Sequence, residues 1–191
     1  IKERFKKIDG MKEKGINPYP SKFDKKNNIS ECLETKLNGK VKTAGRIMSK
    51  RDLGKIAFAN LRDSRGDIQI VFQDQETPGK TFDYFKEYID SGDFVGIEGK
   101  MIKTKTGMLS ILVEKIQILS KSVLPLPEKY HGLQDEEDKL RKRYLDILMN
   151  PEVKEMFVKK QKFWNTIRNF LSDKGFLEVE TPILETSAGG A

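Results

Sequence analysis

The chain has 191 residues, of which 37% are hydrophobic, and it carries a formal net charge of +7. This apolar content is enough for a core and argues against disorder, and the length fits one large or two small domains. A single cysteine, Cys32, and a single histidine, His131, exclude an internal disulfide and a zinc site built from Cys and His. No apolar run approaches the roughly 18 residues that span a bilayer, and residues 1–15 lack the apolar segment of a secretory signal, so we expect a cytoplasmic protein without a membrane partner.

The positive charge lies on the N-terminal side of the sequence. Residues 1–40 hold 11 basic and 6 acidic side chains, whereas residues 121–191 hold 12 of each. A basic module favours a polyanionic partner such as nucleic acid. A lysine-rich surface that serves only solubility would give the same count, so charge alone leaves both readings open.

The first 40 residues predict two helices separated by an extended stretch. Residues 1–14 have the pattern of a charged amphipathic helix that ends at Gly15. The two prolines of "INPYP" enforce an extended segment after it. Ser30 is predicted to cap a short helix in "SECLETK".

The pattern then changes to short strands. We predict three strands, a helix over 81–89, and two further strands. This order is typical of the five-stranded Greek-key OB barrel, which binds oligonucleotides on the face of its second and third strands. The sequence therefore predicts a mainly β fold with flanking helices. The five predicted strands cover 41–48, 56–61, 67–72, 93–103 and 108–119.

The last third predicts helices followed by one strand. A proline-containing linker over 122–132 leads to a helix over 135–150, and a second helix runs from Pro151 to about Lys174. "FLEVETPIL" then has the pattern of a strand interrupted by Pro182. The acidic "DEED" at 135–138 precedes a helix, where negative charge favours the helix dipole, so we interpret it as a cap and not as a metal site.

Side-chain alternation assigns three residues to the outer face of the barrel. Apolar residues at 68, 70 and 72 belong to the core, so Gln69 points outward. Small residues at 57 and 59 suit a tight interior, so Phe58 points outward as well. The same alternation puts Arg46 of the first strand outside.

These three residue types suit the recognition of single-stranded RNA. An exposed aromatic ring stacks on an unpaired base, a glutamine amide offers a donor and an acceptor to a base edge, and an arginine contacts phosphate. The alternative is that Phe58 packs in the core and Gln69 is an ordinary surface amide, because the sequence does not fix strand register.

Several stretches resemble class II lysyl-tRNA synthetases. "LPLPEKYHGLQDEEDKLRKRYLDILMN" (124–150) is similar to the family's linker, and "AGRIMSKRDLGKIAFANLRDSRGDIQI" (44–70) is similar to its anticodon-binding barrel. "GFLEVETPIL" (175–184) resembles the first class II motif, whose proline packs across a dimer interface. The resemblance covers essentially the whole sequence, although the aspartyl and asparaginyl enzymes share the barrel and the proline.

The resemblance implies four regions and a larger parent enzyme. The regions are an N-terminal basic helical extension (1–38), an OB-fold anticodon-binding domain (39–121), a linker (122–134) and the start of a class II catalytic domain (135–191). The parent would be a homodimer that attaches lysine to tRNA(Lys) with ATP and Mg²⁺. The second and third class II motifs are missing, so we expect no catalytic or metal-binding residues here, and a chain that binds RNA without aminoacylating it.

The resemblance also implies roles for single residues. The family stacks the middle anticodon base, uracil, on a phenylalanine that matches Phe58 and contacts it with a glutamine that matches Gln69. An arginine of the first strand matches Arg46. Pro182 would lie at the dimer interface, and the residues Gly189 and Gly190 would begin the amino-acid pocket. Two alternatives remain: an OB module that binds single strands without sequence preference, and an interaction module in which residues 134–191 matter for dimerisation.

Overall fold

The computed structural model describes residues 1–127 and 135–184 of the chain. It divides into two compact units, Ile1–Leu126 and Pro127–Ala191. His131, Gly189 and Gly190 lie outside the described residues, so the predictions made for them stay predictions. No helix among the described residues is long and apolar enough to cross a membrane.

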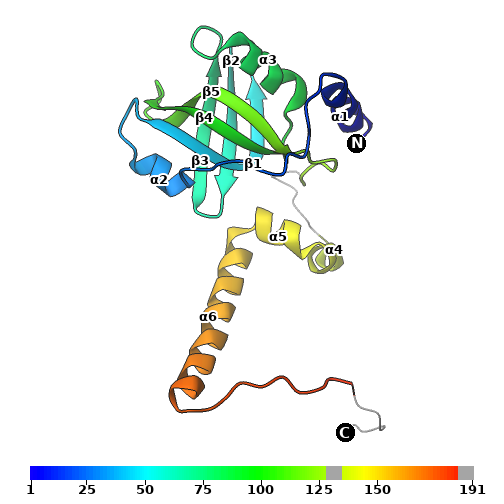
Figure 1. Ribbon diagram of the computed structural model, residues 1–191, viewed down its shortest axis with the longest axis vertical. Helices are drawn as coiled ribbons and strands as arrows, with labels where there is room; N and C mark the ends of the chain where they lie inside the picture. Colours follow the sequence, from blue (N-terminus) through cyan, green and yellow to red (C-terminus); the bar gives the residue numbers. More distant parts are fainter. Residues whose placement is uncertain (128–134, 185–191) are drawn as a thin grey trace. The chain divides into compact units, whose positions relative to one another are not determined.

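The first unit is a closed five-stranded barrel (Figure 1). The strands close in the order β1-β2-β3-β5-β4, because β1 pairs with β4 along its first half and with β2 along its second half. Strands β3 and β5 complete the barrel as a parallel pair. This is the OB barrel that the sequence predicts. The strands are β1 (Lys40–Asp52), β2 (Ile56–Asp63), β3 (Gly66–Gln73), β4 (Phe94–Lys103) and β5 (Leu109–Ser120).

The barrel core consists of the residues that alternation assigns to the interior. Burial alternates along β1 up to Ile47, along β2, and along β3 up to Ile70, whereas Val71 of β3 is buried together with its two neighbours. The predicted orientation of these strands is therefore confirmed. The buried set from the three strands includes Val41, Thr43, Ile47, Ala57, Ala59, Leu61, Ile68, Ile70 and Phe72.

Barrel closure requires close backbone approach at two glycines. A Cβ at Gly45 would collide with the carbonyl oxygen of Arg62, and a Cβ at Gly99 would collide with that of Leu112. Glycine is thus needed where β1 bends from one neighbour to the other and where β4 crosses β5. Strand β1 also carries a bulge between Ile47 and Ser49, which inserts one extra residue opposite β2.

Helix α3 (Gly79–Tyr88) closes one end of the barrel. Its Phe85 ring stacks on Phe72 of β3 with the ring centroids 4.0 Å apart. The Lys50 ammonium donates to the carbonyl oxygens of Phe85, Lys86 and Ile89 at 2.8, 3.1 and 2.8 Å, so a cation caps the negative end of the helix. Burial, with the nearby charge of Lys7, lowers the pKa of Lys50 from 10.5 to about 8.

Helix α1 (Lys2–Glu13) belongs to the same unit and is held by ionic contacts. The Arg4 guanidinium donates to the carbonyl oxygens of Ser122 and Ser91 at 2.7 and 2.8 Å. Lys7 pairs with Asp90 at 2.6 Å, and fully buried Lys121 pairs with both Asp90 and Asp93 at 2.6 Å. We call these seven residues the α1 clasp. It joins the N-terminal helix to the end of β5.

Helix α2 (Ile29–Glu34) corrects one prediction. Its N-cap is Asn28 and not Ser30. The Asn28 side chain accepts from the Glu31 amide at 3.0 Å, and the Glu31 carboxylate accepts from the Asn28 amide at 2.8 Å. This reciprocal capping box satisfies two backbone donors, so the helix starts two residues earlier than a cap at Ser30 would allow.

The second unit contains α4 (Glu136–Arg141), α5 (Arg143–Met149) and α6 (Pro151–Asp173). The single helix predicted over 135–150 is wrong, because the chain turns at Lys142 and Arg143 then pairs with the buried Asp146 at 2.7 Å. Asp135 caps α4 as predicted, accepting from the Asp138 amide at 2.8 Å.

The strand predicted over 176–184 is also wrong. Residues 176–182 form no strand, and no strand in the described part of the chain pairs with them. A strand needs a neighbour for its backbone hydrogen bonds, and Pro182 has no N–H to donate. The side chains of Leu177 and Ile183 are exposed.

We expect Gly99→Ala to destabilise the barrel and Gly79→Ala to leave it intact. Alanine at 99 must displace backbone, at a cost on the order of 1–3 kcal/mol. Gly79 begins α3 with no atom within 4 Å of its Cβ direction, so alanine there should change stability by less than about 1 kcal/mol, upward. Urea unfolding of both variants checks this, and equal losses would contradict the closure argument.

We expect Lys50 to make stability rise with pH above 8. Its folded pKa lies below the ordinary value, so between about 8 and 10.5 the unfolded chain binds more protons than the folded one. The free energy of unfolding of the wild type, minus that of Lys50→Met, should increase from pH 8 to pH 10 and stay constant below pH 7. Urea unfolding across this range measures the difference. Lys105→Met, a matched loss of one exposed charge, is the control, and a flat difference for Lys50→Met would refute the assignment.

Candidate nucleic-acid interface

A groove of about 670 Å³ runs along the outer face of β1, β2 and β3. Its floor comes from these strands, one rim comes from α2, and the other comes from the start of β5. The rim residues Leu33, Met108 and Leu109 have exposed apolar side chains. The groove thus combines apolar rims with a polar floor. Its lining includes Ser49, Arg51, Phe58, Asn60, Asp67 and Gln69.

Phe58 lines this groove from the middle of β2. Its neighbours Ala57 and Ala59 are buried, whereas Phe58 is half-buried and does not belong to the core cluster. Among the described residues, no aromatic ring stacks on Phe58 and no cation lies over it. The outward orientation predicted from alternation is confirmed, and the ring face can accept a planar partner.

Gln69 lies in the same groove, one strand away. It is paired with Asn60 of β2 on one side and with Ser110 of β5 on the other. The Gln69 Oε1 atom accepts a hydrogen bond from the Ser110 hydroxyl at 2.9 Å. Beside it, the Asn60 Oδ1 atom is enclosed and has no hydrogen-bond partner among the described residues. Two side-chain amides, Asn60 and Gln69, therefore lie next to each other in the floor of the groove.

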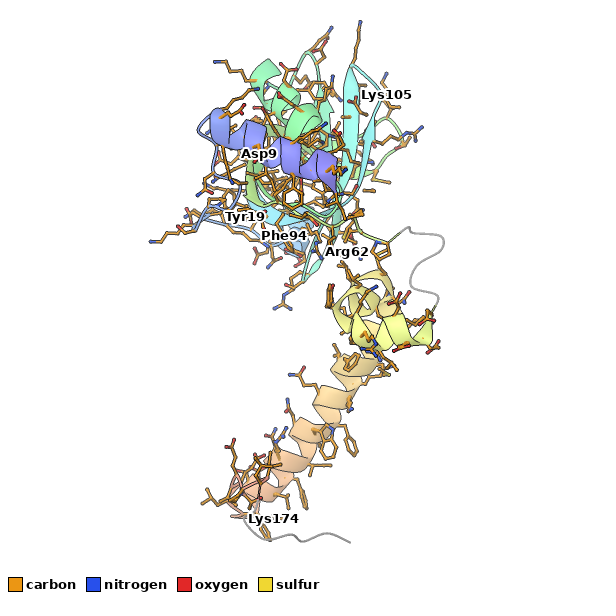
Figure 2. All side chains as sticks on the ribbon, turned by 90° about the vertical axis from the view of Figure 1, so that its right-hand side faces the viewer. Asp9, Tyr19, Arg62, Phe94, Lys105 and Lys174 are labelled. Carbon is orange, nitrogen blue, oxygen red and sulfur yellow. The ribbon has the colours of Figure 1, made fainter. Side chains whose placement is uncertain are left out.

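Arg46 does not line this groove. Its guanidinium lies 4.7 Å from the centroid of the Phe94 ring, and its Nε donates to the Gly92 carbonyl at 3.1 Å. In the sheet Arg46 is paired with Arg62 of β2 and with Phe94 of β4. Figure 2 labels these two partners, and also Lys105 of the β4–β5 loop, which leads to the groove rim at Met108. Lys105 lies away from Phe94 and Arg62 in this view. The structure thus brings Phe58 and Gln69 together, and leaves Arg46 elsewhere on the barrel.

The arginine beside Phe58 is Arg51, which sequence reasoning missed. Arg51 is the cross-strand partner of Phe58 and lines the groove. Alternation counted from Arg46 would put residue 51 inside, but the extra residue of the β1 bulge shifts the count by one. No signal in the sequence marks this bulge. Ser110 was missed for another reason, since the β3–β5 pairing joins residues 41 positions apart.

The residues predicted for the synthetase domain give no site that the structure describes. Pro182 is exposed in the segment after α6. Within residues 1–127 and 135–184, no group of three or more His, Cys, Asp or Glu side chains could hold a metal ion. These residues do not fit a Mg²⁺ site, and we derive no reaction step from them.

Comparison with known proteins identifies both parts of the chain. Residues 41–119 match the family described as OB-fold nucleic acid binding domain, of the tRNA anticodon type. Residues 135–191 match the family described as tRNA synthetases class II (D, K and N). The first match coincides with the barrel that carries the groove.

Curated relatives are similar over the whole chain. It is 47% identical over 193 residues to a lysine–tRNA ligase of Fusobacterium nucleatum, covering 100% of this chain and 39% of that protein. It is 42% identical over 198 residues to a lysine–tRNA ligase of Dehalococcoides mccartyi (99% and 40%), and 45% identical over 194 residues to lysine–tRNA ligase 2 of Methanosarcina mazei (98% and 38%). The chain thus spans about two fifths of the length of these relatives. Over its whole length the chain is therefore similar to class II lysyl-tRNA synthetases, with an OB barrel of the anticodon type at 41–119 followed by a class II synthetase segment at 135–191.

Proposed function

We propose that the groove of the barrel binds the anticodon of tRNA(Lys), and that the whole protein attaches lysine to this tRNA with ATP and Mg²⁺. One observation carries the proposal: an unstacked aromatic ring, Phe58, and a glutamine amide, Gln69, share a groove on the outer face of an OB barrel. The kinship with lysine–tRNA ligases supports the choice of RNA.

The groove suits an unpaired base and its phosphate. A base that enters stacks on Phe58, which places its edge toward Gln69. Arg51 lies across from the ring and supplies a cation for the adjacent phosphate, or a second planar group against the base. We propose uracil, the middle base of the lysine anticodon, as the base that is read. Arg46, in the middle of β1 and outside the groove, remains a second candidate for phosphate contact.

The charge distribution supports approach of a polyanion. Residues 1–40 carry a net charge of +5, and they all belong to the same unit as the groove. Exposed lysines act on phosphates regardless of base sequence, so they raise affinity and association rate without selecting the base. Selection then falls to the groove.

For the second unit we propose a role in a cytoplasmic homodimer. Helix α6 exposes large apolar side chains, and the segment with Pro182 follows it. An apolar face of this kind is buried in stable proteins by a partner. The exposed residues on α6 include Met156, Val158, Phe163, Trp164, Phe170 and Leu171.

We expect Phe58→Ala to weaken binding of a lysine-tRNA anticodon hairpin by about 1–3 kcal/mol, the usual contribution of one stacked base. The ring is outside the core cluster, so the urea midpoint should change little. Fluorescence anisotropy with a labelled hairpin measures the affinity. Phe5→Ala, which removes an exposed ring outside the groove, is the matched control and should bind normally. Normal binding by Phe58→Ala, together with a large loss of stability, would contradict the proposal.

We expect Arg51→Ala to weaken the same hairpin more than Arg46→Ala does. Arg51 lies across from Phe58 in the groove, whereas the Arg46 guanidinium packs on Phe94 and donates to the Gly92 carbonyl. Arg51→Ala should also lower the slope of log affinity against log salt by about one phosphate contact. Titrations at several salt concentrations separate the two. A larger loss for Arg46→Ala would place the phosphate contact at Arg46, outside the groove.

A further inference from the structure

We infer that Ser110 is a positioning residue for base recognition, because it fixes which end of the Gln69 amide faces the groove. The inference rests on the proposed function, since it concerns how the same groove selects a base. Ser110 does not line the groove and needs no contact with RNA. It acts through Gln69.

Ser110 is placed for this task by the parallel pairing of β3 with β5. It lies opposite Gln69 in the register of these strands and is fully buried. Its hydroxyl oxygen lies 2.9 Å from Gln69 Oε1 and 3.5 Å from the Met108 carbonyl oxygen. A serine hydroxyl carries one proton, and the shorter contact to Gln69 takes it.

The opposite orientation of the Gln69 amide is disfavoured. It would turn the NH₂ group toward Ser110, whose hydroxyl would have to accept from it and donate elsewhere. The remaining acceptor, the Met108 carbonyl, is at the limit of hydrogen-bonding distance. This carbonyl already accepts from the Thr104 amide at 2.9 Å and from the Thr104 hydroxyl at 3.2 Å. The surroundings of Ser110 therefore select one of the two amide orientations.

The selected orientation gives the groove a hydrogen-bond donor. Because Oε1 is held by Ser110, the Gln69 Nε2 group is left for a ligand, and no acceptor in the described part of the chain bonds to it. A donor at this position matches a base that presents a carbonyl oxygen, as uracil does, and opposes a base that presents an amino group, as cytosine does. Ser110 would thus fix the orientation of the Gln69 amide, so that the amide offers the groove only a hydrogen-bond donor.

The test compares the full chain on two RNA hairpins that differ only in the middle loop base, uracil or cytosine. In Ser110→Ala the amide can adopt both orientations. Affinity for the uracil hairpin should fall by about twofold, because about half of the molecules then hold the binding orientation. The preference for uracil over cytosine should fall roughly fivefold or more, because the flipped amide accepts from the cytosine amino group.

A double-mutant cycle separates positioning from a structural role. If Ser110 acts through Gln69, Ser110→Ala should change nothing further in a Gln69→Ala background. A merely structural serine would lower the affinity for both hairpins in both backgrounds. Ser110→Thr and Ser110→Val form a matched pair of equal bulk in which only threonine keeps the donor. Threonine should retain the preference for uracil, and valine should lose it. If the added bulk of these two side chains unfolds the barrel, the cycle of Ser110→Ala and Gln69→Ala still tests the positioning role.

The outcomes distinguish this inference from the proposed function. If Gln69→Ala abolishes the base preference and Ser110→Ala keeps it in full, the positioning role of Ser110 is overturned and the anticodon groove stands. If the wild-type chain shows no preference, or Gln69→Ala leaves the preference unchanged, the groove does not read the base through Gln69, and both ideas fail. Loss of preference in Ser110→Ala that is absent in the Gln69→Ala background supports the inference.

Discussion

The geometry of the groove depends on one strand, β1, which pairs with a neighbour on each of its sides. This double pairing closes the barrel, and it is possible because Gly45 allows close backbone approach where the strand bends. The bulge after Ile47 then shifts the outward positions of the second half of β1. As a result Arg51 lies opposite Phe58, while Arg46 packs on Phe94. A small change in the course of one strand thus decides which cation accompanies the aromatic ring.

The local sequence pattern was enough to predict the features that depend only on neighbouring residues in the sequence. The strand order, the core face of β1 to β3, and the outward Phe58 and Gln69 follow from alternation and turn residues, and the structure confirms them. Arg51 could not be predicted, because a bulge depends on how two strands fit together. Ser110 depends on a parallel pairing between distant segments. The strand predicted around Pro182 is absent because an apolar pattern shows only that a segment is suited to a strand. It does not show whether a neighbouring strand is present to pair with the segment.

The placement of Ser110 shows how a barrel can combine rigidity with recognition. A side chain at the rim could be aligned only by its own rotamer, whereas Gln69 stands on a central strand and is held from a buried position on the next one. Its alignment is therefore determined by the same backbone pairing that closes the barrel. Binding residues supported in this way lose little conformational freedom when a ligand arrives, which favours both affinity and discrimination.

The α1 clasp has a mechanical consequence. Arg4 and Lys7 of the first helix reach the carbonyl of Ser122 and the Asp90 carboxylate, next to the point where β5 ends and the chain leaves the barrel. Tension applied along the exit segment would be shared between the last strand and the N-terminal helix, so the barrel resists peeling from that edge. A force on the exit segment would in the same way act on the N-terminal helix, because Arg4 contacts Ser122, 118 residues away along the chain.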